Sequence, residues 1–87
     1  MAEMPIRVKV SYYARFSDAA GTREESYTLA DGSVSVADLL RVIISAHEGI
    51  EKLRKMMRIA VNKEIAEPSR RLRDGDSVAL FPPLSGG

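Results

Sequence analysis

The sequence contains no cysteine and only one histidine, His47. Without cysteine, the fold cannot depend on disulfide bonds, and no thiol can serve as a nucleophile or as a zinc ligand. A single histidine excludes a histidine-rich metal cluster, and we expect no bound metal. The phosphate-binding patterns Gly-x-x-x-x-Gly-Lys and Gly-x-Gly-x-x-Gly are also missing. We therefore expect no bound cofactor, and any ATP chemistry has to come from a partner protein.

The sequence also lacks a long apolar run and a signal peptide, so we expect a cytoplasmic protein without membrane attachment. Its formal net charge of +1 argues against non-specific nucleic-acid binding. The hydrophobic fraction of 45% and the charged fraction of 29% are typical of a soluble globular protein. A length of 87 residues suits a single domain over residues 1–87.

Apolar and polar residues alternate over residues 5–13, which predicts a first strand. Residues 14–20 suit a short helix stopped by Gly21. A second strand is predicted within residues 22–30, followed by a turn at 31–33.

The main helix is predicted to begin after Ser35, with Asp38 three residues later completing a variant capping box. Its apolar positions follow i, i+3, i+4, i+7 spacing and are Leu40, Ile43, Ile44 and His47. A packing or capping role for His47 is favoured over a general base, because nothing near it in sequence orients the ring. Gly49 is predicted to end this helix as a left-handed cap.

The second half of the chain predicts a short helix over 50–57, strands over 58–62 and 77–81, a tight turn at Asn62-Lys63 leading into 64–65, and a turn at 74–76. The order of elements suits an α+β protein with a mixed sheet and one main helix packed across it. A ubiquitin-like β-grasp is the smallest common architecture with this order.

The C-terminus differs from the rest of the chain. Pro82 and Pro83 have no backbone N–H, so the last strand has to stop there, and we expect 82–87 to form a flexible tail. Gly86 and Gly87 lack side chains and can enter a channel too narrow for larger residues. The Gly87 carboxylate is the candidate reactive group, and it requires activation, typically as an acyl-adenylate.

Two further features concern partner binding. Phe81 is predicted to anchor the end of the last strand in the core. Between Lys52 and Arg73 lie eight basic residues and two acidic ones. This region is interpreted either as a solvated face or as an electrostatic docking surface for an acidic partner, with Arg70 and Arg71 as the residues to test.

The closing segment, residues 72–87, has the pattern L-x-D-G-D-x-V-A-x-F-P-P-x-x-G-G. This pattern resembles the end of the MoaD-type small subunits of molybdopterin synthase, sulfur carriers related to ThiS and ubiquitin. Residues 8–14, 36–40 and 59–62 also resemble segments of this family, so the similarity extends over nearly the whole chain.

The resemblance implies that a ubiquitin-activating-like adenylyltransferase uses ATP to adenylate Gly87. Sulfur from a donor protein then converts the carboxylate to a thiocarboxylate. The tail would insert into the large synthase subunit, which supplies the catalytic groups for sulfur transfer to cyclic pyranopterin monophosphate in molybdenum or tungsten cofactor synthesis. Residues implied at the partner interface are Phe81, Pro82, Pro83, Leu84 and Ser85, with Gly86 next to the reactive end.

Other functions remain open at this point. The chain has the features of a ubiquitin-like modifier whose Gly87 is joined to lysines of target proteins, since that chemistry begins with the same adenylate. It also fits a β-grasp interaction module whose diglycine is incidental. A sulfur carrier for thiazole synthesis is disfavoured by the Phe-Pro-Pro segment before the final residues.

Overall fold

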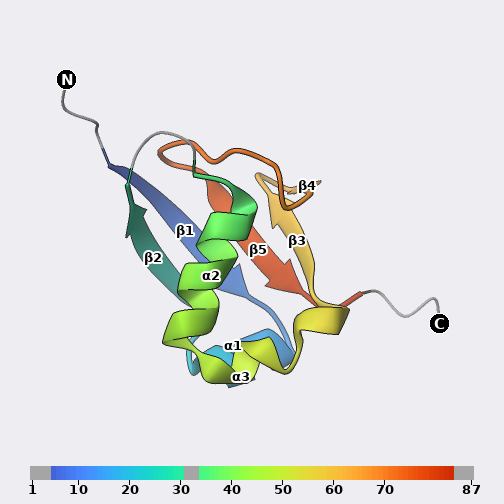
Figure 1. Ribbon diagram of the computed structural model, residues 1–87. Helices are drawn as coiled ribbons and strands as arrows, with labels where there is room; N and C mark the ends of the chain where they lie inside the picture. Colours follow the sequence, from blue (N-terminus) through green and yellow to red (C-terminus); the bar gives the residue numbers. More distant parts are fainter. Residues whose placement is uncertain (1–4, 31–33, 84–87) are drawn as a thin grey trace.

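The computed structural model describes residues 5–30 and 34–83, whose strands form one mixed sheet in the order β2-β1-β5-β3-β4 (Figure 1). The strands are β1 (Ile6–Tyr12), β2 (Glu24–Leu29), β3 (Arg58–Val61), β4 (Glu64–Ile65) and β5 (Ser77–Phe81). The helices are α1 (Arg15–Ala20), α2 (Val36–Ala46) and α3 (Glu48–Glu51), with a 3₁₀ turn, η1, at Arg54–Met56. β1 and β5 pair in parallel, and the other strand pairs are antiparallel. The predicted β-grasp is confirmed.

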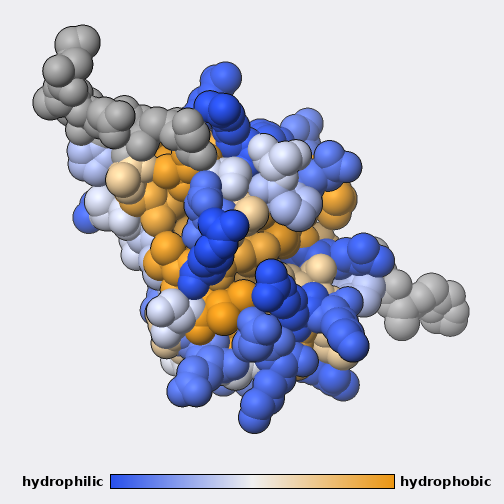
Figure 2. Space-filling model, viewed as in Figure 1, coloured by the Kyte–Doolittle hydropathy of each residue, from blue (hydrophilic) through white to orange (hydrophobic). Residues whose placement is uncertain are grey.

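The core lies between α2 and one face of the sheet. In β1 the alternate residues Ile6, Val8, Val10 and Tyr12 are buried, as the sequence pattern predicted. The helix contributes Val36, Leu39, Leu40 and Ile43. Seen from the α2 side, apolar surface is visible beside the helix, and charged side chains gather over α3 and η1 (Figure 2). The opposite face of the sheet has no helix on it in the described part of the chain.

The beginning of α2 agrees with its predicted capping box. The Ser35 Oγ accepts a hydrogen bond from the Asp38 N–H at 3.3 Å, and the Asp38 Oδ2 accepts one from the Ser35 N–H at 2.9 Å. Two of the N–H groups at the start of the helix are thereby satisfied.

The predicted end of α2 is wrong. The helix ends at Ala46, His47 is its extended C-cap residue, and Gly49 lies inside α3 without a positive φ. Glycine is favoured at this position for a different reason, because a Cβ built on Gly49 would lie 3.3 Å from the Ala19 Cβ, which is closer than most real contacts. Glycine therefore allows α3 to pack closely against α1. By contrast, Gly21 does end α1 in the left-handed conformation, with φ of 76°.

The predicted helix over 50–57 is divided into α3 and η1, because the chain has to turn before it enters β3 at Arg58. Ile50 is fully buried, and Leu53 and Met57 pack against the core as partly buried side chains. The apolar positions were therefore predicted correctly, although the helix is interrupted.

The tight turn between β3 and β4 is confirmed, and it is strained. Asn62 and Lys63 have φ of 51° and 70°, values that favour glycine. Lys63→Gly is expected to raise the free energy of unfolding by about 0.5–1 kcal/mol, because glycine removes the left-handed strain. Urea unfolding measures the change, and Lys63→Ala removes the same side chain without relieving φ. If both variants are stabilised equally, or if Lys63→Gly is not stabilised at all, this explanation is wrong.

Some expectations fall outside the described residues, namely the turn at 31–33 and the part of the tail over 84–87. Within residues 5–30 and 34–83, every helix is too short to cross a membrane.

Candidate functional site

The base of the tail is held by the middle of the sheet. β5 lies between β1 and β3 and leads directly into Pro82 (Figure 1). On one side, the Tyr13 N–H donates a hydrogen bond to the Leu80 carbonyl at 3.0 Å. On the other side, Arg58 pairs with Phe81 across the antiparallel ladder. The strand ends at Phe81, as the prolines predicted, so the chain enters the tail from a position fixed on both sides.

The prediction that Phe81 anchors the strand in the core is wrong. Burial alternates along β5: Val78 and Leu80 are buried, whereas Ala79 and Phe81 are partly exposed. Because successive side chains of a strand point to opposite faces, Phe81 lies on the face away from α2, and Leu80 is the core anchor. Phe81 is therefore available at the surface, immediately before the tail.

Phe81 belongs to an apolar strip on the uncovered face of the sheet. Directly paired residues of neighbouring strands share a face, so Ala79 lies beside Ala60, and Ala60 lies beside Ile65. The Ile65 side chain is 72% exposed. We refer to Ala60, Ile65, Ala79 and Phe81 as the sheet patch. Ala60 itself is buried, so the exposed apolar surface of the patch comes from Ile65 and from the partly exposed Ala79 and Phe81. Phe81 lies next to the point where the tail leaves the domain, with the exposed Arg58 beside it.

The structure does not bring Arg70 and Arg71 near Phe81. Both arginines lie in the loop before β5, and they line a pocket with Asp76 at the start of that strand. Phe81 lies at the other end of β5, which is about 13 Å long from its first to its last residue. Figure 1 shows this loop, in orange, at the end of the sheet opposite the C-terminus. The remaining predicted site residues are outside the described part of the chain: Leu84, Ser85, Gly86 and Gly87.

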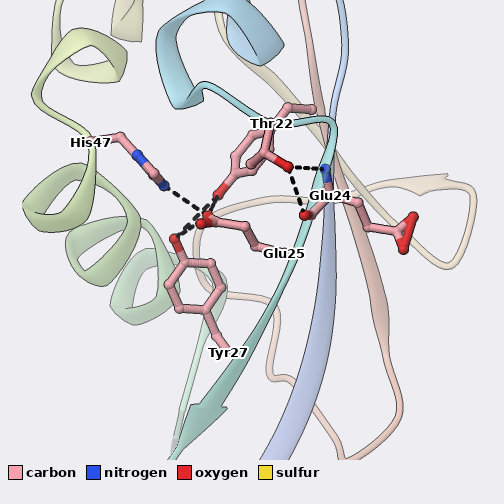
Figure 3. A network of polar contacts seen from close by, with 6 residues as sticks. Thr22, Glu24, Glu25, Tyr27 and His47 are labelled. Atoms are coloured by element: carbon pink, nitrogen blue, oxygen red, sulfur yellow. Dashed lines mark hydrogen bonds and ion pairs between the residues drawn. The ribbon is translucent and has the colours of Figure 1, made fainter.

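Sequence reasoning missed a polar network inside the domain (Figure 3). One carboxylate oxygen, Glu25 Oε1, accepts hydrogen bonds from the Tyr12 hydroxyl at 2.7 Å, the Tyr27 hydroxyl at 2.8 Å and the His47 Nε2–H at 2.7 Å. The Tyr12 and His47 rings also meet edge to face, with centroids 5.9 Å apart. These residues come from β1, β2 and the end of α2, so no local spacing in the sequence links them.

The network links β1, β2 and the end of α2 through hydrogen bonds to one carboxylate. Burial raises the pKa of Glu25, but hydrogen bonds from Tyr12, His47 and Tyr27 outweigh burial and hold that pKa below its usual 4.5. Burial, with hydrogen bonds to Tyr27 and Glu25, raises the pKa of Tyr12 far above its ordinary value. Burial also raises the pKa of Tyr27, with a further contribution from Glu25. Glu25 is thus an anion that only accepts hydrogen bonds, and the tyrosines are neutral donors. This agrees with the packing role predicted for His47.

Glu25→Gln is expected to lower the free energy of unfolding at pH 7 by about 1–2 kcal/mol, because the buried donors lose a charged acceptor. The pKa of Glu25 is lower in the folded protein than the usual 4.5. The ionised Glu25 side chain therefore stabilises the fold fully above pH 4.5, the pKa of the unfolded chain. This stabilisation is lost as pH falls through the lower pKa of the folded protein. The difference between wild type and Glu25→Gln should accordingly shrink in acid, as measured by urea unfolding at neutral and acidic pH.

The neighbouring exposed carboxylate provides the control for this prediction. Among the described residues, the Glu24 carboxylate pairs only with the Lys9 Nζ, at 3.3 Å. Glu24→Gln should change the free energy of unfolding by less than about 0.5 kcal/mol. Equal effects of the two substitutions, or a Glu25→Gln difference that does not change with pH, would contradict the assigned role.

Comparison with known proteins places these features in a family. The model of the ThiS family matches residues 10–87. The molybdopterin synthase sulfur carrier subunit of Chlamydomonas reinhardtii is 40% identical over 84 residues, which cover 94% of this chain and 100% of that protein. Small archaeal modifier protein 1 of Haloferax volcanii is 31% identical over 83 residues, which cover 86% of this chain and 94% of that protein. The structure of a putative molybdopterin converting factor, subunit 1, from Pyrococcus furiosus has a TM-score of 0.83 at 34% identity. The match covers 91% of this chain and 99% of that chain. The chain therefore belongs to the ThiS family and has its ubiquitin-like β-grasp fold.

Proposed function

We propose that this protein is the sulfur-carrying small subunit of a molybdopterin synthase, with Gly87 as the carrier residue. The observation that carries the proposal is the 40% identity to an algal sulfur carrier subunit along the whole length of that subunit. The Phe-Pro-Pro segment and the terminal diglycine lie within the matched region, residues 10–87. The position of Phe81, at the surface and at the base of the tail, is compatible with this role.

The chemistry takes place on the terminal carboxylate. A carboxylate oxygen of Gly87 attacks the α-phosphate of ATP bound to an adenylyltransferase, and pyrophosphate leaves. A hydrosulfide ion delivered by a donor protein then attacks the acyl carbon, and AMP leaves as the C–O bond to its phosphate breaks. Loss of the remaining proton leaves the Gly87 thiocarboxylate. In the large synthase subunit, the thiocarboxylate sulfur bonds to a carbon of cyclic pyranopterin monophosphate as a C–O bond of that substrate breaks. Water then hydrolyses the resulting thioester, which leaves the sulfur on the substrate and restores the Gly87 carboxylate. This chain supplies the acyl group, and the partners supply the catalytic groups.

The large subunit binds the sheet patch and the tail together. Six residues follow Phe81, the last of them Gly87, and six extended residues span at most about 20 Å. A partner that covers the sheet patch can therefore hold its active site up to that distance from the domain. Pro82 and Pro83 stiffen the first part of the tail, and Leu84 and Ser85 contact the channel that receives the two glycines.

Arg70 and Arg71 contribute to association with an acidic partner. They lie at the end of β5 away from the tail. Because complementary charges steer two proteins together before they touch, reversal of both charges is expected to slow association with the large subunit by about tenfold at low salt and to flatten its salt dependence. The rate of sulfur transfer within the formed complex should not change. Stopped-flow association at several salt concentrations measures the effect, and unchanged on-rates would refute a docking role.

Deletion and complementation in the source cells test the proposed function. Cells without the gene should lose molybdopterin, and the wild-type gene should restore it, whereas a gene ending at Gly86 should not.

The similarity to a protein named as a small archaeal modifier supports a second function, conjugation of Gly87 to lysines. In that case Gly-Gly remnants appear on other proteins and molybdopterin persists in the deletion strain. A thiamine requirement would instead identify a thiazole-synthesis carrier.

A further inference from the structure

Three arginines surround a pocket of about 400 Å³ at the end of the sheet that faces away from the tail. The pocket is lined by Asn62, Arg70, Arg71, Arg73 and Asp76. We refer to it as the arginine pocket. Its volume falls within the range of small-ligand sites, and its lining contains no aromatic residue.

The backbone holds these arginines in place. The Val36 N–H at the start of α2 donates to the Arg70 carbonyl at 2.9 Å. Leu72 is buried between exposed Arg71 and Arg73. Because alternate residues of an extended segment point to the same side, these two side chains both point away from the core. The guanidinium groups are therefore carried by a segment that is fixed to the domain.

The only carboxylate in the pocket is already engaged. Asp76 is 8% exposed, and its Oδ1 accepts from the Asn62 side-chain N–H at 2.9 Å. Its Oδ2 accepts from the Arg73 backbone N–H at 2.8 Å. Among the ion pairs of residues 5–30 and 34–83, none includes Arg70, Arg71 or Arg73. Three guanidinium charges against one carboxylate leave a net charge of two positive units in the pocket.

We propose that the arginine pocket binds a phosphate-class dianion, either inorganic phosphate or a phosphate monoester. Guanidinium groups present paired N–H donors that match the oxygens of phosphate. A dianion neutralises the net charge of the pocket. The lining contains no aromatic ring on which a nucleobase could stack, and the charged donors match the phosphate group itself. This binding is separate from the Gly87 chemistry and lies beyond the proposed carrier function, but it shares Arg70 and Arg71 with the proposed docking of an acidic partner.

Titration of the full-length ¹⁵N-labelled protein with sodium phosphate, at constant ionic strength in chloride, tests the proposal. Amide signals of Arg71, Arg73 and Ser77 are expected to shift and to saturate, with a Kd on the order of 1 mM. Arg71→Gln and Arg73→Gln should each weaken binding by about tenfold. Arg54→Gln removes the same charge outside the pocket and should change Kd by less than about twofold. The amide spectrum of each variant reports whether it is folded.

Two further titrations identify the ligand class. Glycerol 1-phosphate that binds more tightly than inorganic phosphate indicates a monoester, and the opposite order indicates free phosphate. Shifts that never saturate, or equal weakening by Arg54→Gln, would show general charge screening and overturn the proposal. Succinate or a glutamate-rich peptide binding in preference to phosphate would also overturn it, because the pocket would then be a carboxylate docking site. None of these outcomes changes the result of a mass measurement on Gly87, so the two proposals fail separately.

Discussion

One alanine appended after Gly87 is expected to lower sulfur transfer by at least about 100-fold. The extra residue moves the carboxylate by about 3.5 Å along the extended chain. A misplacement of about 1 Å in a reacting group can already cost about 100-fold, because the group no longer meets its reaction partner in the correct geometry. The added side chain is also expected to obstruct entry into the proposed channel for the two glycines. Molybdopterin formation, in cells and with purified large subunit, measures the loss.

The control for this extension is one alanine added before Met1, at the other end of the chain. This variant should retain full activity. Removal of the C-terminal alanine with a carboxypeptidase should restore transfer in the extended protein. If cofactor synthesis survives the C-terminal extension, the free carboxylate of Gly87 is not the reactive group.

Phe81→Asp is expected to weaken binding of the large subunit by about 100-fold. Phe81 is a partly exposed aromatic side chain in the sheet patch, next to the tail. Aromatic anchors of this kind contribute about 2 kcal/mol or more to binding when a partner covers them, and a buried unpaired carboxylate adds a further cost. Since Phe81 lies outside the core, the free energy of unfolding should change by less than about 1 kcal/mol. Calorimetric titration and urea unfolding measure the two quantities.

Two residues of the same strand provide matched controls. Ser77→Asp introduces the same charge on the same face at the other end of β5, and affinity should change by less than about threefold. Leu80→Ala truncates a fully buried side chain and should lower the free energy of unfolding by about 3 kcal/mol. Its affinity for the large subunit, measured under conditions where it is folded, should remain close to wild type. Equal loss of affinity in Phe81→Asp and Ser77→Asp would exclude a specific contact at Phe81.

Elements with regular periodicity could be predicted from the sequence. β1 alternates apolar and polar residues, β5 is an apolar run that stops at two prolines, and α2 combines an apolar stripe with a capping box, so local chemistry determines where these elements form. Asn62 and Lys63 could likewise be placed in a tight turn, because the turn connects two adjacent strands.

Features that depend on contacts between distant segments could not be predicted. Gly49 was misassigned because its role depends on the approach of Ala19 from another helix. The face occupied by Phe81 follows from the register of β5, and a shift of one residue exchanges the two faces. The network around Glu25 joins three elements, and the arginine pocket exists only because Arg73 and Asn62 meet in space.

The intact mass of the protein isolated from its own cells tests the central claim most directly. We expect a species heavier by the difference between one sulfur atom and one oxygen atom, with fragmentation placing the change at Gly87. Incubation with the large subunit and its substrate should return this species to the mass of the free carboxylate. A protein that carries no sulfur at Gly87 in cells actively making the cofactor, while its Gly-Gly remnant is found on lysines of other proteins, would contradict the carrier function.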